Sequence, residues 1–442
     1  MTTYPSSALL REEAGVPDVE HLAADPYRVL RVASQYASLG LYRKAVEILS
    51  RKYPKVSADR SEPGVTLPQN NPLVAYFRGY CRENLGESGA EDFAEASRLS
   101  TLYVFPSTVY DKLALEAALH FNAKDATAHY LLGDWYFARA KTPEALRHWA
   151  DARERNPQIP ALEASMGLAL LHEDRDFGRA FEAFDDGIKN DPRNIVNYTG
   201  AVVTMTLQGR TPGDRVKEIE RYPDIKQILE PLVYELALNR VESGDYQGSV
   251  DLFRDRFFGR EEGGTNVRQV WVEVRLLQAM GLASAGKCGE ALKIADTLGS
   301  PVAGLSFTLD GLGRFLETSR TRYLLGTLYA SCAQPEKATT KFSQAARGGG
   351  LIDVLWVWAA SQKLGKSDLD SRDRMLTAAS EAEGRAKRRV HESLWHYTAG
   401  ILLAAAGQPE RATKNLREAF LYPDDGLSHH LARLALAGTT PR

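Results

Sequence analysis

Small and large apolar residues follow a helical spacing over residues 126–159, ATAHYLLGDWYFARAKTPEALRHWADARERNPQI. This spacing predicts two amphipathic helices that pack antiparallel. Gly133 is small enough to let the two helices approach closely, and Trp149 is large enough to fill the space beside that contact. Pro157 predicts the end of the second helix, because proline lacks a backbone N–H. The positions that define the pattern are Leu132, Gly133, Tyr136, Ala145, Trp149, Ala152 and Pro157.

The same spacing returns later in the chain. The second copy has Tyr323, Leu325, Gly326, Tyr329, Ala338, Phe342 and Ala345. Period and residue order resemble the tetratricopeptide repeat, a helix pair of about 34 residues. Weaker copies centre on Gly40, Gly167, Gly244, Gly286 and Gly400, and the copy at Gly167 carries one inserted residue. We count about eight units of this kind, plus irregular helical pairs near 193–222 and 351–390.

One such pair cannot bury its own apolar face, so neighbouring pairs must stack. We therefore expect an all-α protein, a right-handed superhelical solenoid of stacked tetratricopeptide helix pairs. The amphipathic segment 429–438 is expected to cap the last repeat, with burial against a partner as the alternative. The expected parts are residues 1–110 with irregular inserts at 55–72 and 100–108, a central array over 111–350, and 351–442 with a helical pair, the last unit and the capping helix.

Charge and cysteine content bear on the class of partner and on the cellular compartment. The chain has 55 Lys and Arg against 57 Asp and Glu, a balance that argues against binding nucleic acid or anionic lipid through net charge. Cys81, Cys288 and Cys332 are odd in number and far apart, so we expect no disulfide framework and a reducing compartment. The N-terminus lacks a secretion signal, and the apolar run at 401–406 is too short to cross a bilayer. These features predict a cytoplasmic protein.

Motifs for catalysis are not found in the sequence. It contains no serine elbow, phosphate-binding glycine loop, HExxH or paired CxxC. His391 and His396 are five residues apart and fall on different faces of a helix, and His429 and His430 point away from each other. We expect ordinary surface or interhelix histidines, no catalytic residue, no cofactor and no metal.

Repeat arrays of this kind usually bind along the inner wall that the first helix of each pair lines. Tetratricopeptide co-chaperones that grip the C-terminal carboxylates of a peptide carry Lys and Asn at these inner positions. In this sequence the same positions hold Tyr, Asp, Ser34 and Leu, so a carboxylate-binding groove of that kind is disfavoured. The tyrosines have a second interpretation, because they could simply pack between successive helices. The candidate groove residues are Tyr76, Tyr80, Thr127, Tyr130, Asp134, Phe137, Arg320, Tyr323 and Thr327.

The irregular parts of the chain carry a further resemblance. Residues 61–108, the repeat HYLLGDWYFARAKTPEALRHW and the stretch RDRFFGREEGG at 254–264 together resemble the C-terminal tetratricopeptide region of large bacterial proteins. In that family the region follows an uncharacterised β-rich domain, similar to the mutarotase-like sandwiches of carbohydrate-active enzymes. The resemblance implies a bacterial protein with a β-rich neighbour. Any carbohydrate chemistry belongs to that neighbour, which this sequence does not include.

The stretch STLYVFPST at 100–108 reads as a buried strand within a helical chain. Four apolar residues in a row, Leu102 to Phe105, either plug the groove between the second and third repeats or present an edge to another domain. The plug is the favoured interpretation, and in the alternative Tyr103 and Phe105 are the docking residues. Ser107 or Thr108 is expected to cap the next helix.

A second insert, FFGREEGGTN at 257–266, is longer than a repeat turn needs. Its adjacent carboxylates, Glu261 and Glu262, favour a solvated loop. If they have a function, they would reach into the site of a neighbouring domain.

These patterns predict a tetratricopeptide scaffold that mediates protein–protein or interdomain interaction and is not itself an enzyme. The expected partner is another protein or domain, with a β-rich mutarotase-like domain as one candidate. The alternative is the accessory C-terminal region of a bacterial carbohydrate-active enzyme whose catalytic domain lies outside this sequence.

Overall fold

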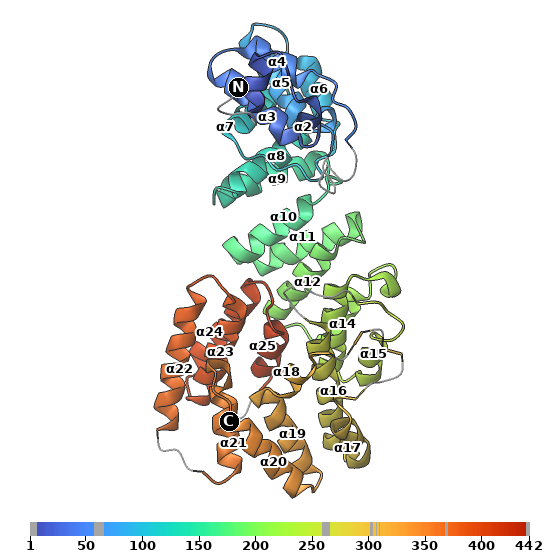
Figure 1. The fold of residues 1–442 in the computed structure, drawn as a ribbon, viewed down its shortest axis with the longest axis vertical. Coiled ribbons are helices and arrows are strands. Elements are labelled where there is room, and N and C mark those ends of the chain that lie inside the picture. Colours follow the sequence, from blue (N-terminus) through green and yellow to red (C-terminus); the bar gives the residue numbers. More distant parts are fainter. Residues whose placement is uncertain are drawn as a thin grey trace. The chain divides into compact units, whose positions relative to one another are not determined.

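A computed structural model describes residues 7–56, 66–258, 266–300, 304–305, 307–308, 310–366 and 370–438 of the 442. Over this part of the chain the protein is all-α, with 25 α-helices packed pairwise and one isolated antiparallel bridge between Arg254 and Leu305 (Figure 1). None of these helices combines the length and apolar character needed to span a membrane.

The chain separates into two compact units, one ending at Asp191 and one beginning at Pro192. This division reflects compactness, whereas the three parts expected from sequence group the repeats by their regularity. The three-part organisation therefore stays a prediction.

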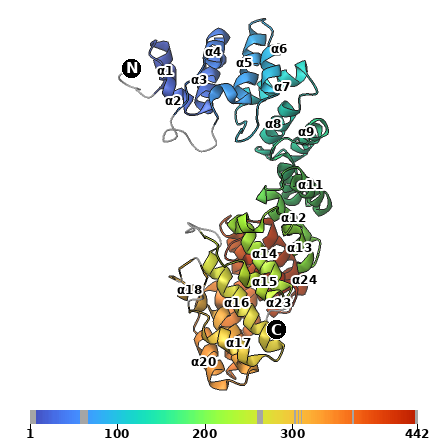
Figure 2. The same cartoon turned by 90° about the vertical axis from the view of Figure 1, so that its right-hand side faces the viewer.

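The first unit holds the helices α1 to α11. Its consecutive helices pack as pairs, and Figure 2 shows α3–α4, α5–α6 and α8–α9 following one another. The bounds are α1 (Ala8–Glu13), α2 (Val19–Ala23), α3 (Pro26–Ser38), α4 (Tyr42–Leu49), α5 (Pro72–Asn84), α6 (Ala90–Ala96), α7 (Val109–Phe121), α8 (Ala126–Phe137), α9 (Thr142–Arg155), α10 (Leu162–Ala169) and α11 (Phe177–Asn190).

Close packing of glycine against a large side chain sets the distance between paired helices. A Cβ atom placed on Gly133 of α8 would lie 2.5 Å from the indole of Trp149 of α9, well inside van der Waals contact. The same clash, at 2.5 to 2.7 Å, recurs in four other pairs: Gly79 with Phe93, Gly167 with Phe184, Gly326 with Phe342, and Gly400 with Leu416. The spacing predicted from the sequence is thus confirmed as tetratricopeptide-like helix pairing in both units.

Local signals place the helix ends. Thr108 caps α7 with its hydroxyl on the backbone N–H of Asp111, whose side chain in turn accepts from the backbone N–H of Thr108. α9 ends at Arg155, two residues before Pro157, as predicted.

The residue inserted in the unit around Gly167 is absorbed by a π-helical turn over Leu170–Asp174. Gly167 and Phe184 are 17 positions apart, one more than Gly133 and Trp149, yet they make the same close contact. A π turn takes up one extra residue without ending the helix. The repeat therefore keeps its packing despite the insertion.

The second unit holds the helices α12 to α25. Its pairs include α16–α17, α19–α20 and α23–α24. The bounds are α12 (Ile195–Leu207), α13 (Pro212–Ile219), α14 (Glu230–Glu242), α15 (Tyr246–Asp251), α16 (Val267–Ser284), α17 (Cys288–Asp296), α18 (Gly313–Leu316), α19 (Ser319–Ser331), α20 (Pro335–Ala345), α21 (Val354–Lys363), α22 (Ser371–Ala386), α23 (Glu392–Ala405), α24 (Pro409–Glu418) and α25 (Ser428–Leu436).

The last helix, α25, does more than cap the final pair. It packs against α23 and α24, as a capping helix would, and its side chains also reach α14 and α16 much earlier in the chain. The buried imidazole of His430 contacts Glu242 at 2.7 Å and Glu273 at 3.1 Å. Arg433 donates to Glu242 at 2.8 Å. Within this unit, the C-terminal helix therefore lies between the last helix pair, α23–α24, and the earlier helices α14 and α16.

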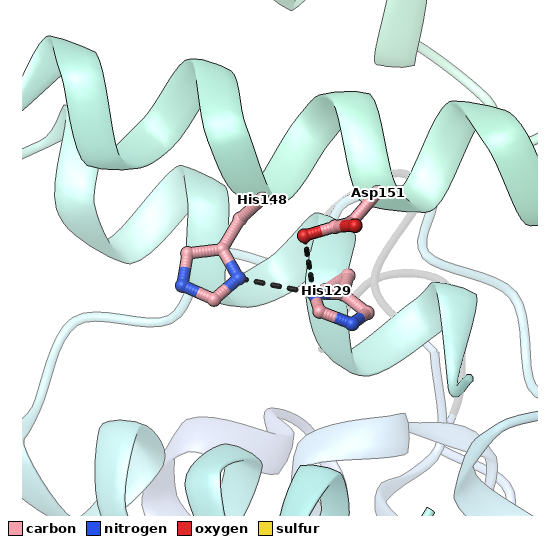
Figure 3. Close-up of side chains that lie close together, drawn as sticks. All are labelled: His129, His148 and Asp151. Carbon is pink, nitrogen blue, oxygen red and sulfur yellow. Dashed lines mark hydrogen bonds and ion pairs between the residues drawn. The ribbon is translucent and has the colours of Figure 1, made fainter. Parts of the chain in front are cut away.

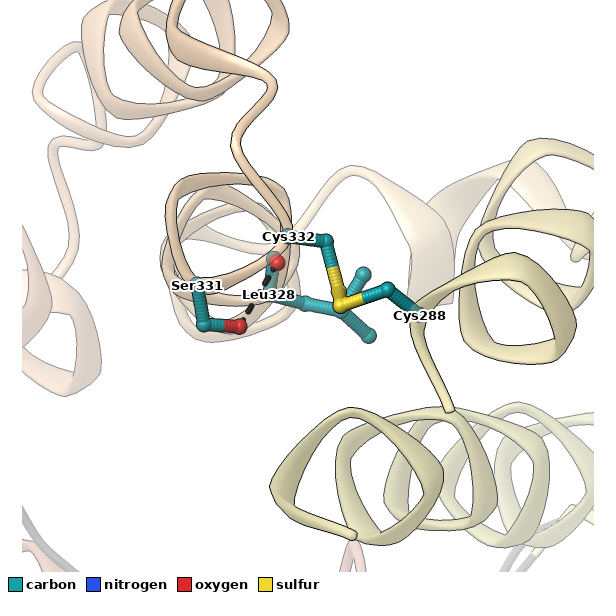
Figure 4. Close-up of a disulfide and its surroundings, with 4 residues drawn as sticks. All are labelled: Cys288, Leu328, Ser331 and Cys332. Carbon is teal, nitrogen blue, oxygen red and sulfur yellow. Dashed lines mark hydrogen bonds between the residues drawn. A yellow bond between two sulfur atoms is a disulfide. The ribbon is translucent and has the colours of Figure 1, made fainter. Parts of the chain in front are cut away.

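A disulfide corrects the prediction drawn from the cysteines. Cys288, at the start of α17, and Cys332, which ends α19, are bonded to each other and join two successive helix pairs (Figure 4). Cys81 is buried and free. The sequence separation of 44 hid this pairing, because only the stacking of the repeats brings the two thiols together. Disulfides are rare in reducing compartments, so the expectation of a cytoplasmic setting loses the support of the cysteines.

Candidate functional site

The candidate groove residues of the first unit are mostly structural. Tyr76 is fully buried and donates its hydroxyl to both carboxylate oxygens of Asp125, at 2.9 and 3.0 Å. The hydroxyl of Thr127 donates to the backbone oxygen of Ser97. Tyr130 is also buried. For these three side chains, packing between helices is the interpretation that fits.

Asp134, Phe137 and Tyr80 lie nearer the surface. Asp134 accepts a hydrogen bond from the indole N–H of Trp149 at 3.0 Å, and burial raises the pKa of its carboxyl to about 7. Phe137 is exposed beside the Trp149 ring. Tyr80 is half-buried and stacks on Phe77. Of the six predicted groove residues in this unit, Phe137 and Tyr80 offer the most aromatic surface to a ligand.

In the second unit, the predicted residues Arg320, Tyr323 and Thr327 already have partners within the chain. Arg320 donates two hydrogen bonds to Glu273, at 2.6 and 2.7 Å. The ring of Tyr323 packs between Phe342 and Trp356. The hydroxyl of Thr327 donates to a backbone oxygen one turn back in its own helix. A ligand would have to displace these contacts.

Arg320 and α25 belong to one buried ionic network. Glu273 joins Arg320 to His430, and Glu242 joins His430 to Arg433 and to Arg215. Burial alone would raise the pKa of Glu242, but the charges of Arg433 and His430 outweigh it and lower that pKa to about 2. Burial opposes the charging of His430, whereas its bonds to the two glutamates raise its pKa. The network therefore holds α25 in place through paired charges.

A cavity of about 210 Å³ lies beside this network. Glu273 and Arg320 face it, but these two groups are paired with each other. Its other walls include the aromatic rings of Trp356 and Tyr397 and the side chain of Leu427. It thus presents apolar surface next to the ion pair of Glu273 and Arg320.

The segment 100–108 does not plug a groove, so the favoured interpretation from sequence was wrong. Leu102, Tyr103 and Phe105 are 49, 60 and 66 % exposed, and only Val104, at 2 %, is buried. The segment forms a turn rather than a strand, with Tyr103 in the left-handed region at φ 59°. The run of four apolar letters hid this geometry, because a turn can bury one residue and expose its neighbours.

The backbone of this segment is also not a free strand edge. The N–H of Val104 bonds to the backbone oxygen of Thr101, and the N–H of Phe105 donates to the hydroxyl of Tyr27 at 2.5 Å. What the segment offers a partner is therefore its side chains. The other pair of predicted docking residues, Glu261 and Glu262, lies outside the described residues.

A cluster that the sequence analysis missed joins α8 and α9 (Figure 3). The Nδ1 atoms of His129 and His148 lie 3.0 Å apart, and a carboxylate oxygen of Asp151 lies 3.9 Å from Nδ1 of His129. Burial, then the neighbouring His129, lowers the pKa of His148 to about 4. His129 and His148 are 19 residues apart, so only the register of the helix pair brings them together.

Comparisons with known proteins give fold-level likeness alone. No protein-family model matches the chain, and no curated protein matches it in sequence. A tetratricopeptide repeat protein from Parabacteroides merdae aligns over 76% of this chain and 98% of its own, with 14% identity and a TM-score of 0.26. Yeast Tom70 aligns over 94% of this chain and 88% of its own, with 12% identity and a TM-score of 0.32. A chain in the crystal structure of the APC/C hetero-tetramer Cut9–Hcn1 aligns over 99% of this chain and 82% of its own, with 14% identity and a TM-score of 0.28.

Proposed function

We propose that this chain is a helical-repeat scaffold that binds another protein and performs no catalysis of its own. The observation that carries the proposal is the exposed segment Leu102–Phe105, which we call the aromatic turn. Three of its four side chains, those of Leu102, Tyr103 and Phe105, are exposed to solvent. Exposed clusters of large apolar side chains mark interaction surfaces, and aromatic residues are enriched at protein interfaces.

The aromatic turn is held in a defined shape. Val104 anchors it in the core, and the N–H of Phe105 is tied to Tyr27. A positive φ at a tyrosine costs conformational energy, which the surrounding contacts must offset. A side chain already fixed before binding loses less conformational entropy in a complex. These features support a preformed docking surface.

The inner wall supports binding less well. Most of the predicted groove residues are buried or bonded within the chain, and α25 occupies part of the second unit's interior. We therefore place docking on the aromatic turn, with Tyr80 and Phe137 as secondary surface.

For the partner we propose a protein domain rather than a charged polymer, because the aromatic turn recognises apolar surface and the chain's net charge is only −2. The resemblance stated from the sequence makes a bacterial, β-rich, mutarotase-like domain the first candidate to test. In that case the chain would serve as the accessory region of a carbohydrate-active enzyme.

Two variants at matched exposed positions test the proposal. Phe105→Asp places a charge in the aromatic turn, whereas Leu39→Asp places one at another exposed apolar site of the same unit. We expect both to keep the helical circular dichroism signal, and Phe105→Asp alone to lose binding to a purified β-rich candidate domain or to any protein co-purified with the wild-type chain. A co-purified partner retained equally by both variants would contradict docking at the aromatic turn.

A further inference from the structure

We infer that His129, His148 and Asp151 form a binding site for a divalent cation of the zinc class between α8 and α9. His129 projects from α8, while His148 and Asp151 are three residues apart on α9 and so share one face of that helix. Figure 3 shows the three side chains converging from the two helices. Imidazole nitrogen and carboxylate oxygen are the ligands that Zn²⁺ takes in sites with three protein ligands and one open position.

The hydrogen bonds of His129 orient it as a ligand. Its Nε2 lies 3.2 Å from the backbone oxygen of Ala123, which can only accept, so Nε2 carries the proton. Nδ1 of His129 is therefore the unprotonated nitrogen, and it is this atom that faces His148 and Asp151. A histidine whose second nitrogen donates to a carbonyl is the usual arrangement around a bound metal.

The separations fit one ion. Two ligand atoms at tetrahedral positions about Zn²⁺, each about 2.0 to 2.1 Å from the metal, lie about 3.3 to 3.4 Å apart. The distances from Nδ1 of His129, 3.0 Å to His148 and 3.9 Å to Asp151, fall on either side of this value. All three ligand atoms lie within 4.8 Å of one another. Nδ1 of His148 carries the proton of this contact, so metal binding moves that proton to Nε2 of the same ring. Small side-chain rotations would then bring the three ligand atoms to a common distance from the ion.

Neighbouring groups fix the two α9 ligands. The ring of Tyr136 stacks on His148 at 7° between planes. Arg155 binds Asp151 through Oδ1 at 3.1 Å, whereas the oxygen that faces His129 is Oδ2. The charge of Arg155 weakens the attraction for a cation but leaves that oxygen available.

The second group of potential ligands in the described residues, Glu235, Asp424 and His429, is less suited to a cation. Glu235 there already pairs with the guanidinium of Arg433 at 3.4 Å. The side chain of Arg433 is 5% exposed and that of Arg155 is 26% exposed, so the charge of Arg433 is less screened by solvent and opposes a cation more strongly.

The test uses the untagged full chain after treatment with a chelator. Titration with Co²⁺ should give the intense visible absorption of a four-coordinate site at one equivalent per chain, and Zn²⁺ should displace it. Asp151→Asn, which keeps size and shape, and His148→Ala should each weaken Zn²⁺ binding by about tenfold or more. His120→Ala, an exposed histidine on α7, is the matched control and should bind like the wild type.

Folding is checked separately from binding. In chelator each variant should still unfold cooperatively, with the unfolding temperature of His148→Ala lowered because it loses the ring that stacks on Tyr136. Zn²⁺ should raise the unfolding temperature of the wild type and of His120→Ala only. Absence of stoichiometric binding by the wild type would overturn the site. So would equal binding by His148→Ala, Asp151→Asn and the wild type, or a loss in His120→Ala that matched theirs.

Discussion

In the α8–α9 pair of the first unit, Trp149 packs on Gly133 and the helices are held by apolar contact. In the second unit, α25 is held by His430 and Arg433, buried among glutamates of α14 and α16. The first contact spans 16 residues of sequence, and the charged ones span 157 to 191. The same architecture thus uses two kinds of attachment: a local one that repeats along the chain, and a long-range one that occurs where α25 returns to earlier helices.

Removing a charge from the α25 network should have the largest effect. Glu242→Ala removes the buried carboxylate that His430, Arg433 and Arg215 share, which should lower the free energy of unfolding of the second unit by about 3 to 5 kcal/mol. Glu220→Ala, which removes a more exposed partner of Arg240, should cost less than about 1 kcal/mol. Hydrogen exchange on peptides of α14 and α8 measures both units in one experiment. Equal losses in the two variants would mean that the network does not hold α25.

Opening the disulfide should have the next largest effect, again on the second unit. The loop of 44 residues predicts a loss of about 2 to 4 kcal/mol when Cys288 and Cys332 are both replaced by Ser. Reductant should lower the unfolding midpoint of the wild type and leave that of the double variant unchanged. A midpoint of the wild type that does not respond to reductant would argue against a stabilising bridge.

Adding one methyl group tests the local contact of the first unit. In Gly133→Ala the new Cβ lies 2.5 Å from the Trp149 ring, so we expect a loss of about 1 to 3 kcal/mol. Gly384→Ala, within α22, meets no atom within 4 Å and should instead stabilise by about 0.4 to 1 kcal/mol. Urea unfolding of the two variants checks the opposite signs. If Gly133→Ala left the free energy of unfolding unchanged, α8 and α9 could move apart without loss of stability.

The free energy of unfolding should depend on pH in opposite directions at these two attachments. Each titrating group changes it by at most about 1.4 kcal/mol per pH unit. Asp134, with a folded pKa of about 7, holds a proton that the unfolded chain releases near pH 4. Its contribution therefore falls as pH rises from about 4 to about 7. Glu242 has a folded pKa of about 2, so its contribution to stability is fully present above about pH 4.3. That stability is lost as pH falls toward 2.

Single variants separate these two pH effects. Asp134→Asn should flatten the stability profile of α8–α9 between pH 5 and 7, and Glu242→Gln that of α14 between pH 4 and 2. Unfolding followed by hydrogen exchange at several pH values resolves the two. An unchanged slope in either variant would assign the pH dependence to other groups.

The repeats were predictable because their contacts are local. Gly133 and Trp149 sit at a spacing that the sequence displays directly, and even the inserted residue before Asp174 was visible as a break in the period. The ends of α7 and α9 followed from Thr108 and Pro157 for the same reason.

The candidate sites depended on contacts that no local pattern encodes. His129 meets His148, Cys288 meets Cys332, and His430 meets Glu242 only after helices have packed. The prediction for the aromatic turn failed for a different reason. Hydrophobicity predicted burial of the whole run, whereas the chain turns at Tyr103, where φ is positive, and only Val104 is buried.

The bond between Cys288 and Cys332 also makes the stretch between α17 and α19 a closed covalent ring. A protease that cut once inside this ring would open it without releasing a fragment, since the sulfur bridge still connects the two sides. The nicked chain would migrate as one molecule on a denaturing gel until reductant was added. Between α17 and α19 the two sides of the array are therefore joined by two covalent connections, the main chain and the disulfide.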